Sequence, residues 1–289
     1  MTTQFTIYEL PCTLFYRAKP LYAPAPFDQP AYDAVFEGRQ PGRIFVDDAD
    51  APTAALMCRT YEYYVAGTPV PSLRAFIKDA PEEVGVFQQL YDYTPIGEAW
   101  VSAMLEDAPL EVIGRSNFQW DMRKPAPDIP APNGARVVPI DLALAEQVDI
   151  ALGIPFLQLS WNDRRTFVEH GFGYCALQGD EVASAIYAIA VSSAGVIVGI
   201  DTVEKYQRQG YGSAVSAAFI REALKRGLQT VWDTDEENFR SIAMAKKLGF
   251  VEYEPYKELF PPERKPQLSR GIWSRGDTRA DGVTEWVRH

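Results

Sequence analysis

Histidine and cysteine are both scarce in this chain of 289 residues. Because the two histidines are His170 and the final residue, His289, a histidine-based zinc site or a Ser-His-Asp triad would have to rest on His170 alone. The three cysteines, Cys12, Cys58 and Cys175, are widely separated and show no metal-binding spacing. These scarcities weigh against hydrolases, metalloenzymes and disulfide frameworks, and we expect buried, reduced thiols and no metal.

The sequence also has no basic-then-apolar leader and no apolar run of about 18 residues, which would be needed to span a bilayer. Lysine and arginine number 28 against 39 aspartates and glutamates, which gives a net charge of −11. Such a charge repels nucleic acids and anionic lipid. We therefore expect a cytoplasmic protein that binds neither nucleic acid nor membrane, although an anionic cofactor can still bind through main-chain amides.

Composition and proline content suggest how the chain is divided. Hydrophobic residues make up 47% and charged residues 23%, as in globular proteins, and the length fits two domains or one large one. Four prolines between residues 125 and 134 exclude helix and sheet there. We expect a domain over 1–124, a linker over 125–134, a second domain over 135–260 and a tail over 261–289. The charged tail is either a solvated arm or docked through Ile272, Trp273 and Trp286.

The first domain has the pattern of a small α+β unit. Prolines between Pro20 and Pro30 argue against a regular element there. No Gly-rich phosphate loop and no clustered acid–base pair occurs in this half. The expected elements are strands over 43–46, 54–66 and 110–120 and helices over 72–78 and 96–106.

The second domain has a more regular pattern. Its order, β-α-α-β-β-β-α-β-α-β, predicts a mixed sheet in the α/β class, with an antiparallel meander followed by a parallel crossover. The expected strands are 135–139, 173–177, 182–191, 196–203, 230–234 and 250–253, and the expected helices are 142–151, 163–169, 210–225 and 238–248.

The stretch 200–213 carries the clearest chemical signal. An apolar strand leads into a short loop with Gly210 and Gly212, and an amphipathic helix follows at once. The first amides of a helix have no helical acceptor, and together with the helix dipole they attract anions such as a diphosphate. Arg208 could add a side-chain charge. The lysine of a Walker A phosphate loop is missing, which weighs against a nucleoside triphosphate site. Val215 stands where a dinucleotide-binding fingerprint has its third glycine, which weighs against a dinucleotide site.

Two motifs in order resemble the GNAT superfamily of N-acetyltransferases. The first is Gln207-Arg208-Gln209-Gly210-Tyr211-Gly212, which matches the family's acyl-CoA motif [QR]-x-x-G-x-[GA] at a strand-loop-helix junction. The second comprises Asn238, Ser241 and Ala245-Lys246-Lys247-Leu248-Gly249-Phe250. As local structure the second motif is also a well-capped helix, with Asn238 at its start and Gly249 at its end. The resemblance covers about residues 135–256.

The resemblance implies a GNAT-like acyl-CoA-binding fold, with acetyl-CoA as acyl donor and a small-molecule or peptide amine as acceptor. Strand 196–203 would splay from strand 230–234, so that main-chain groups of Ile200 and Thr202 bond the pantetheine arm and the thioester. The amine would attack the thioester directly, without a covalent intermediate. The implied cofactor-binding residues are Ile200, Thr202, Gln207, Arg208, Gln209, Gly210, Tyr211, Gly212, Ser213 and Asn238.

The chain departs from common family patterns in its proton-handling residues. Ala245 stands where many members have a tyrosine acid, and Val196, Ile197 and Val198 stand where many have a glutamate base. Asp233 is the first candidate base and Asp201 the second, although a solvated carboxylate at a strand end explains either residue as well. The missing acid and base keep open an alternative function, that of a non-catalytic acyl-CoA sensor or scaffold.

A narrower resemblance points to the two-domain GNAT group that includes zwittermicin-resistance acetyltransferase. In that group the first half resembles a degenerate GNAT-like domain without a working cofactor loop, and we expect it to shape the acceptor pocket. The prediction is therefore an acetyl-CoA-dependent N-acetyltransferase, whose acidic surface suits a cationic primary amine. The narrower resemblance lies in Gly42-Arg43-Ile44-Phe45-Val46-Asp47-Asp48 with Pro52, Gly171-Phe172-Gly173-Tyr174-Cys175 and Val231-Trp232-Asp233-Thr234.

Overall fold

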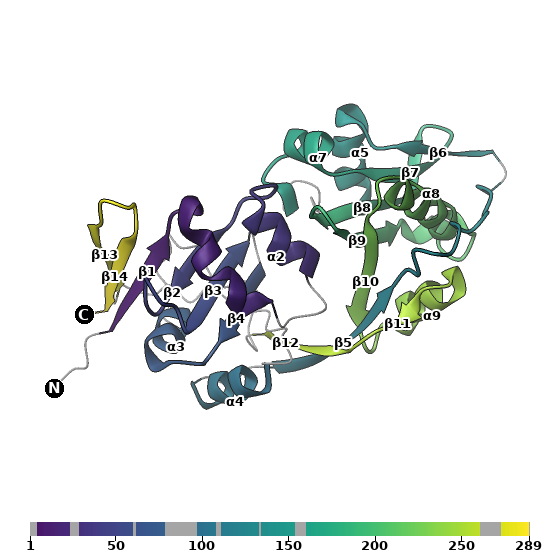
Figure 1. Ribbon diagram of the computed structural model, residues 1–289. Helices are drawn as coiled ribbons and strands as arrows, with labels where there is room; N and C mark the ends of the chain where they lie inside the picture. Colours follow the sequence, from purple (N-terminus) through teal and green to yellow (C-terminus); the bar gives the residue numbers. More distant parts are fainter. Residues whose placement is uncertain are drawn as a thin grey trace. The chain divides into compact units, whose positions relative to one another are not determined.

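A computed structural model describes residues 5–23, 29–59, 62–78, 97–107, 111–132, 134–153, 160–260 and 273–288 (Figure 1). The chain forms two compact units, which interleave along the sequence. Unit 1 comprises Met1–Pro26, Pro41–Gly114 and Tyr256–His289, and unit 2 comprises Phe27–Gln40 and Arg115–Pro255. This division differs from the domain boundaries expected from the sequence: the proline-rich stretch 125–134 belongs to unit 2, and the C-terminal tail belongs to unit 1 with the N-terminal strands.

Unit 1 is built on an antiparallel sheet of the order β13-β14-β1-β2-β3-β4. Aromatic side chains fill its core, where Phe76 of α3 packs against Phe45 and against Trp273 and Trp286. The strands are β1 (Thr6–Leu10), β2 (Arg43–Val46), β3 (Ala54–Arg59), β4 (Glu62–Gly67), β13 (Trp273–Thr278) and β14 (Thr284–Arg288), and the helices are η1 (Cys12–Arg17), α1 (Lys19–Tyr22), α3 (Pro71–Lys78) and α4 (Gly97–Asp107).

Residues 273–288 of the C-terminal tail are docked and do not form a solvated arm, whereas Ile272 lies outside the described residues. β14 pairs with β1, and β13 pairs with β14. The rings of Phe76 and Trp273 meet edge to face with their centroids 5.0 Å apart, and the Trp286 indole Nε1–H donates to Glu9 over 3.1 Å. Burial of two large aromatic side chains outweighs the pull of the tail's charges toward solvent.

Three expectations in unit 1 were wrong. The span 54–66 is a hairpin of β3 and β4 instead of one strand, with Arg59 opposite Glu62. A helical turn, α1, lies in the stretch from which prolines were expected to exclude one, because Pro20 stands in the first turn, where no N–H donor is needed. Cys12 is exposed, whereas the other two cysteines are buried as expected.

Unit 2 contains most of an eight-stranded sheet of the order β11-β5-β10-β9-β8-β7-β6, with β12 paired to β5. The element order predicted for residues 135–253 is confirmed. The strands of this sheet in unit 2 are β5 (Glu111–Gln119, from Arg115), β6 (Ala135–Pro139), β7 (Gly173–Gln178), β8 (Glu181–Val191), β9 (Gly195–Thr202), β10 (Gln229–Asp235) and β11 (Val251–Glu252). Strand β12 (Tyr256–Phe260) belongs to unit 1. The helices are α2 (Gln29–Phe36), α5 (Leu142–Leu152), α7 (Arg164–His170), η3 (Glu204–Tyr206), α8 (Tyr211–Lys225) and α9 (Phe239–Leu248).

Strand β5 completes the second sheet although the sequence placed it in the first domain. The unit boundary falls inside this strand, and its residues from Arg115 to Gln119 pair antiparallel with Asp235 to Val231 of β10. β10 therefore has a partner on each side, parallel β9 and antiparallel β5.

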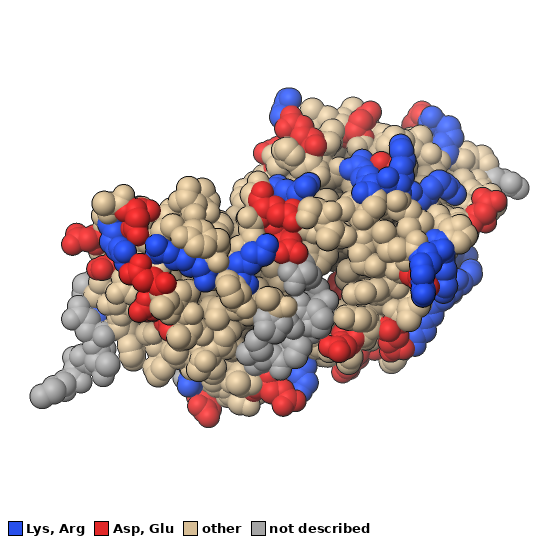
Figure 2. Space-filling model, in the orientation of Figure 1, with Lys and Arg blue, Asp and Glu red and all other residues tan. Residues whose placement is uncertain are grey.

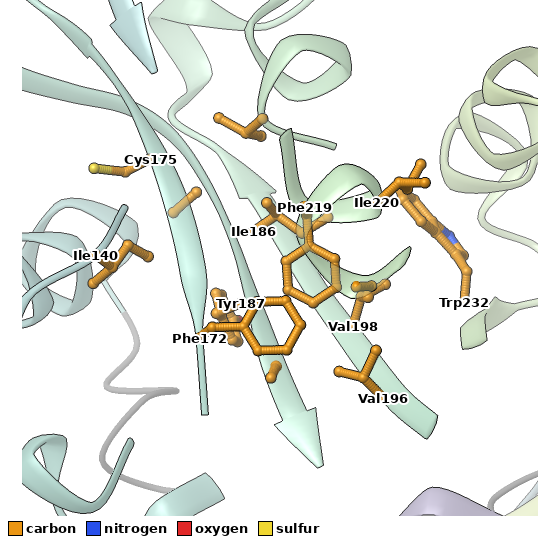
Figure 3. Close-up of a cluster of buried hydrophobic side chains, with 14 of the residues drawn as sticks. Ile140, Phe172, Cys175, Ile186, Tyr187, Val196, Val198, Phe219, Ile220 and Trp232 are labelled. Carbon is orange, nitrogen blue, oxygen red and sulfur yellow. The ribbon is translucent and has the colours of Figure 1, made fainter. Parts of the chain in front are cut away.

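The core of unit 2 includes the layer between its sheet and helix α8 (Figure 3), and buried residues of α5 and α7, such as Val148 and Phe167, belong to the same cluster. The rings of Phe172 and Phe219 stack with their centroids 4.5 Å apart, next to Ile186 of β8 and Val198 of β9. Among the described residues, no helix is both long and apolar enough to cross a membrane.

Candidate functional site

Strands β9 and β10 run parallel at their beginnings and then separate. Their paired residues end at Ile197 opposite Val231, whereas β9 continues to Thr202 and β10 to Asp235. Each strand stays paired with its other neighbour, β9 with β8 as far as Thr202 and β10 with β5 as far as Asp235. The gap is therefore a local opening between two strands that the rest of the sheet holds in place.

Main-chain groups of both strands face this opening. The Val203 amide donates to Ala183 of β8, and pairs in an antiparallel ladder alternate between bonded and non-bonded. The amides and carbonyls of Ile200 and Thr202 consequently point away from β8, toward β10. On β10, Thr230 accepts from Trp120 on the β5 side, so by the same alternation the main chain of Asp233 faces β9. The orientation expected for Ile200 and Thr202 is thus present.

The loop after β9 turns sharply before helix α8 begins. Arg208 and Gly210 both have left-handed backbones, with φ of 60° and 94°. Gly210 is the N-cap of α8, and its carbonyl accepts the first helical hydrogen bond, from Ala214 over 3.0 Å. No side chain caps this helix start. A glycine is needed at 210 because side chains with a Cβ rarely adopt this conformation.

The amides from Arg208 to Ser213 have no hydrogen-bond acceptor in the described part of the chain. They occupy two consecutive features, the tight turn and the first turn of a 15-residue helix. Successive free amides at a helix start form a concave group of donors with the positive end of the helix dipole behind it. We call this group, Arg208 to Ser213, the amide cradle. Its chemistry suits an anion such as a diphosphate.

The two glycines of the motif have different roles. A Cβ on Gly210 would meet nothing closer than Pro132, 3.9 Å away, so the space in front of it is open. A Cβ on Gly212 would lie 3.2 Å from both Thr202 Oγ1 and Met244 Cε. Gly212 therefore lets α8 approach β9 and α9 closely, which brings the cradle next to the end of the opening.

The other expected cofactor residues lie around the cradle, and several already have partners. The Gln207 side chain donates to the Thr202 carbonyl over 3.2 Å, and the Gln209 side chain donates to Lys205 over 2.8 Å. The Tyr211 hydroxyl is hydrogen bonded to Gln178 over 2.8 Å. These bonds make the loop rigid, so that these side chains support the main-chain donors.

Asn238 caps the neighbouring helix. Its Oδ1 accepts from the Ser241 amide over 3.1 Å, and the Ser241 hydroxyl accepts from the indole of buried Trp232 over 3.0 Å. The helix that Asn238 begins, α9, reaches the cradle through Met244. Because the cap uses Oδ1, the side-chain amide nitrogen is the group of Asn238 that remains for a ligand.

Positive charge is concentrated near α8 and α9 although the chain is acidic overall. Figure 2 shows Lys and Arg gathered over this part of unit 2 on the visible face, whereas Asp and Glu are scattered over both units. In the loop before α8, Lys205 is paired with Glu181, and Arg208 is exposed. An anionic ligand would meet a locally favourable field there.

The two candidate bases lie on the same face of the sheet. Thr202 faces α8, where its hydroxyl lies beside Gly212, and Trp232 faces α9 through its bond to Ser241. Side chains alternate along a strand, so Asp201 and Asp233 point to the opposite face. Carboxylates from both strands of the opening therefore lie on the side away from the cradle's helix.

Their surroundings differ. The Asp233 carboxylate accepts from Arg115 of β5, over 2.5 Å from Nη2 and 3.1 Å from Nε, and the same guanidinium contacts Asp235. Asp201 has no ion-pair partner among the described residues. Although Asp201 keeps solvent access, desolvation of its carboxylate raises its pKa above the ordinary value. A raised pKa makes a carboxylate a stronger base near neutral pH.

Arg115 is the site residue that the sequence did not reveal. It lies 118 residues before Asp233 in the chain. The two residues meet only because β5 pairs with β10, and local sequence patterns do not predict which strands pair. The sequence did predict the strand that carries Arg115, just before the proline-rich segment, but not its partner.

Comparisons with known proteins agree with this geometry. A family model described as GNAT acetyltransferase matches residues 26–259. An uncharacterized N-acetyltransferase of Bacillus subtilis (strain 168), YdfB, is 26% identical over 215 residues, which cover 73% of this chain and 82% of that protein.

Solved structures show the same fold. A GCN5-related N-acetyltransferase-like protein from Streptococcus suis 89/1591 is similar with a TM-score of 0.69 and 25% identity, covering 86% of this chain and 98% of that one. A tandem GNAT protein from the clavulanic acid biosynthesis pathway is similar in fold, with a TM-score of 0.61 and 14% identity over 90% of this chain and 99% of that one. The two-unit architecture is thus consistent with a tandem GNAT arrangement.

Proposed function

Because this chain belongs to the GNAT acetyltransferase family, whose members are acyltransferases, we propose that it transfers an acetyl group from acetyl-CoA to a primary amine. The observation that carries the proposal is the amide cradle: the amides from Arg208 to Ser213 have no acceptor in the described chain and lie beside an opening between two strands. No lysine or metal is needed at such a site, because main-chain donors and a helix dipole supply the positive potential.

The cradle would hold the diphosphate of acetyl-CoA, and the strand opening would hold its pantetheine arm. Bound acetyl-CoA supplies a thioester, whose carbonyl carbon is the electrophile. The free amides of Ile200 and Thr202 face the opening and are the donors that would align the arm and polarise the carbonyl. The side-chain amide of Asn238 is available beside the cradle for the same arm.

Asp201 accepts the proton in this proposal. An acceptor that arrives as an ammonium ion first loses one proton to water, which frees the lone pair on its nitrogen. The neutral amine nitrogen then attacks the thioester carbon, the C–N bond forms, the C–S bond breaks, and the sulfur leaves as a thiolate with the electron pair. The nitrogen must lose a proton, and a nearby carboxylate of raised pKa is suited to take it. Asp233 is less suited because the Arg115 guanidinium already neutralises it. Asp201 is therefore the first candidate base and Asp233 the second, which is the reverse of the ranking from the sequence.

The acceptor would approach from the face that carries Asp201 and Asp233. The single Arg115 guanidinium offsets one of the negative charges of Asp233 and Asp235, and Asp201 adds another carboxylate, so the face keeps a negative charge that favours a group arriving as a cation. A small-molecule or peptide amine fits this field, and an anionic acceptor does not.

The test is to incubate the full chain with acetyl-CoA and a panel of amines and to monitor free thiol and acetylated product. We expect thiol release that depends on the amine and is stoichiometric with product. If CoA binds tightly and no amine on a broad panel releases thiol, the protein is an acyl-CoA sensor or scaffold and the enzymatic proposal is wrong.

A further inference from the structure

Strand β8 contains an irregularity at the level where β9 leaves β10. Its register with β9 shifts between Ala188, which is opposite Val198, and Ala190, which is opposite Ile197. Ile189 is therefore an extra residue, a β-bulge. Ile197 is also the last β9 residue that pairs with β10. Bulges bend a strand and increase its twist, so this one lies where it can turn β9 away from its parallel neighbour.

Side chains from outside the sheet hold the bulge carbonyls. The Gln40 side-chain amide donates to Ile189 O over 2.9 Å and to Ser160 O over 3.0 Å. The Trp161 indole donates to Ala188 O over 2.8 Å. Gln40 is 3% exposed and Trp161 is fully buried. We call Gln40 and Trp161 the bulge clamp.

The clamp also explains a glycine on β9. A Cβ on Gly199 would lie 2.6 Å from the Tyr187 ring and 3.1 Å from Ile189 Cδ1. The bulge thus brings two large side chains of β8 over one residue of β9, next to Ile200. Any shift of Ile189 would be transmitted to the first free amide of the strand opening.

Gln40 reaches the bulge because a segment from the first part of the sequence packs on unit 2. Helix α2 contacts β8 and β9, and Pro30 lies against Gly195. Just after α2, the Glu37 carboxylate accepts from the Ser193 amide over 2.7 Å and from its hydroxyl over 2.5 Å. Glu37 thus anchors the same segment at the β8–β9 turn, and its carboxylate, an acceptor, makes no bond to the bulge carbonyls.

We propose that Gln40 is a positioning residue for acyl transfer: it fixes the β8 bulge and thereby the angle at which Ile200 and Thr202 face the opening. This inference rests on the proposed acetyl transfer. It concerns a side chain that touches neither the cradle nor the carboxylates, from a segment that the sequence placed in another domain.

The test compares Gln40→Met with Glu37→Ala in the full chain. Gln40→Met keeps the side chain's length and removes the donor, whereas Glu37→Ala removes the two hydrogen bonds to Ser193 and the ion pair with Arg39 and leaves the bulge carbonyls bonded. For Gln40→Met we expect kcat to fall about 10- to 100-fold, because small misplacement of reacting groups is costly. Affinity for free CoA should stay within about twofold, since the cradle is separate from the clamp. Glu37→Ala should keep kcat near the wild-type value.

Hydrogen–deuterium exchange gives a readout without turnover. By the alternation described above, the amides of Gly199 and Asp201 bond to β8. We expect these two amides to exchange faster in Gln40→Met than in Glu37→Ala, when both variants are measured at the same interval below their melting temperatures. Equal kcat in Gln40→Met and wild type, or equal losses in both variants, overturns the inference. If exchange is faster in Gln40→Met but the wild type has no turnover, the bulge clamp is supported as a structural feature and the proposed function is refuted.

Discussion

The two units each contain a strand that runs into a helix, and the two junctions differ in their free amides. At the β4–α3 junction of unit 1, the Thr68 amide donates to Thr53 O and the Val70 amide to Thr68 O. Pro69 and Pro71 have no amide hydrogen, so only the Ser72 and Leu73 amides at this helix start lack an acceptor in the described chain. At the β9–α8 junction of unit 2, the amides from Arg208 to Ser213 lack acceptors among the described residues.

The strands differ in the same sense. β4 is the last strand in the order of the unit 1 sheet, whose described strand pairs are antiparallel, whereas β9 lies between two strands and separates from one of them. The proposed CoA site uses free amides together with an adjoining gap. Of these two junctions, only the β9–α8 junction has both in the described chain.

The largest effect, a loss of CoA affinity, is expected from Gly210→Glu, and Gly227→Glu is its control variant. Both glycines have positive φ and open space, and they lie at opposite ends of α8. A carboxylate in the cradle would lie close to the diphosphate, and like charges about 4 Å apart repel by about 4 kcal/mol near a protein surface, so CoA should bind roughly a thousandfold more weakly. Isothermal titration measures the affinity. Similar losses in the two variants would show that strain, and not the cradle, causes the effect.

Asp201→Asn comes next, compared with Asp233→Asn. Loss of the base should lower kcat by about a hundredfold, with CoA affinity unchanged. Asp233→Asn breaks the ion pair with Arg115, so its main effect should be on thermal stability. Steady-state kinetics and thermal unfolding separate these outcomes, and a larger kcat loss in Asp233→Asn would restore Asp233 as the base.

Asp201 also predicts how stability depends on pH. Its raised pKa means that the folded state binds its proton more tightly than the unfolded state, so Asp201 reduces stability as pH rises above the ordinary value of about 3.9. Asp201→Asn removes this cost. The melting temperature of the variant relative to wild type should therefore increase between acidic and neutral pH. A difference that is constant over this range would show that the carboxylate is not desolvated.

The smallest effect is expected at the unit 1 junction. Pro71→Ala restores an amide at the start of α3 and should lower the free energy of unfolding by about 0.4–1 kcal/mol, because the unfolded chain gains freedom. It should leave CoA affinity and stoichiometry unchanged in titration. A second CoA site in this variant would show that amides at a helix start can bind CoA without an adjoining gap between strands.

Local patterns in the sequence predicted much of unit 2. The spacing around Gly210 and the cap at Asn238 are short-range features, and the structure places both as helix starts. Strand order from Ala135 onward followed from hydrophobic periodicity in the same way. The assignment of ligand contacts to these residues stays a prediction.

The rest depended on pairings between distant parts of the chain. Arg115 reaches Asp233 only through the β5–β10 register, and Gln40 reaches Ile189 across 149 positions. The docking of Trp286 beside Glu9 joins the two ends of the sequence. Local propensity and spacing do not encode such contacts, because they result from how whole elements pack.

The most direct test of the central claim is a crystal structure of the full chain with acetyl-CoA bound. The account predicts diphosphate oxygens about 3 Å from main-chain nitrogens between Arg208 and Ser213, with the thioester beside Ile200 and Thr202. Diphosphate bound anywhere else, including the start of α3, would contradict it.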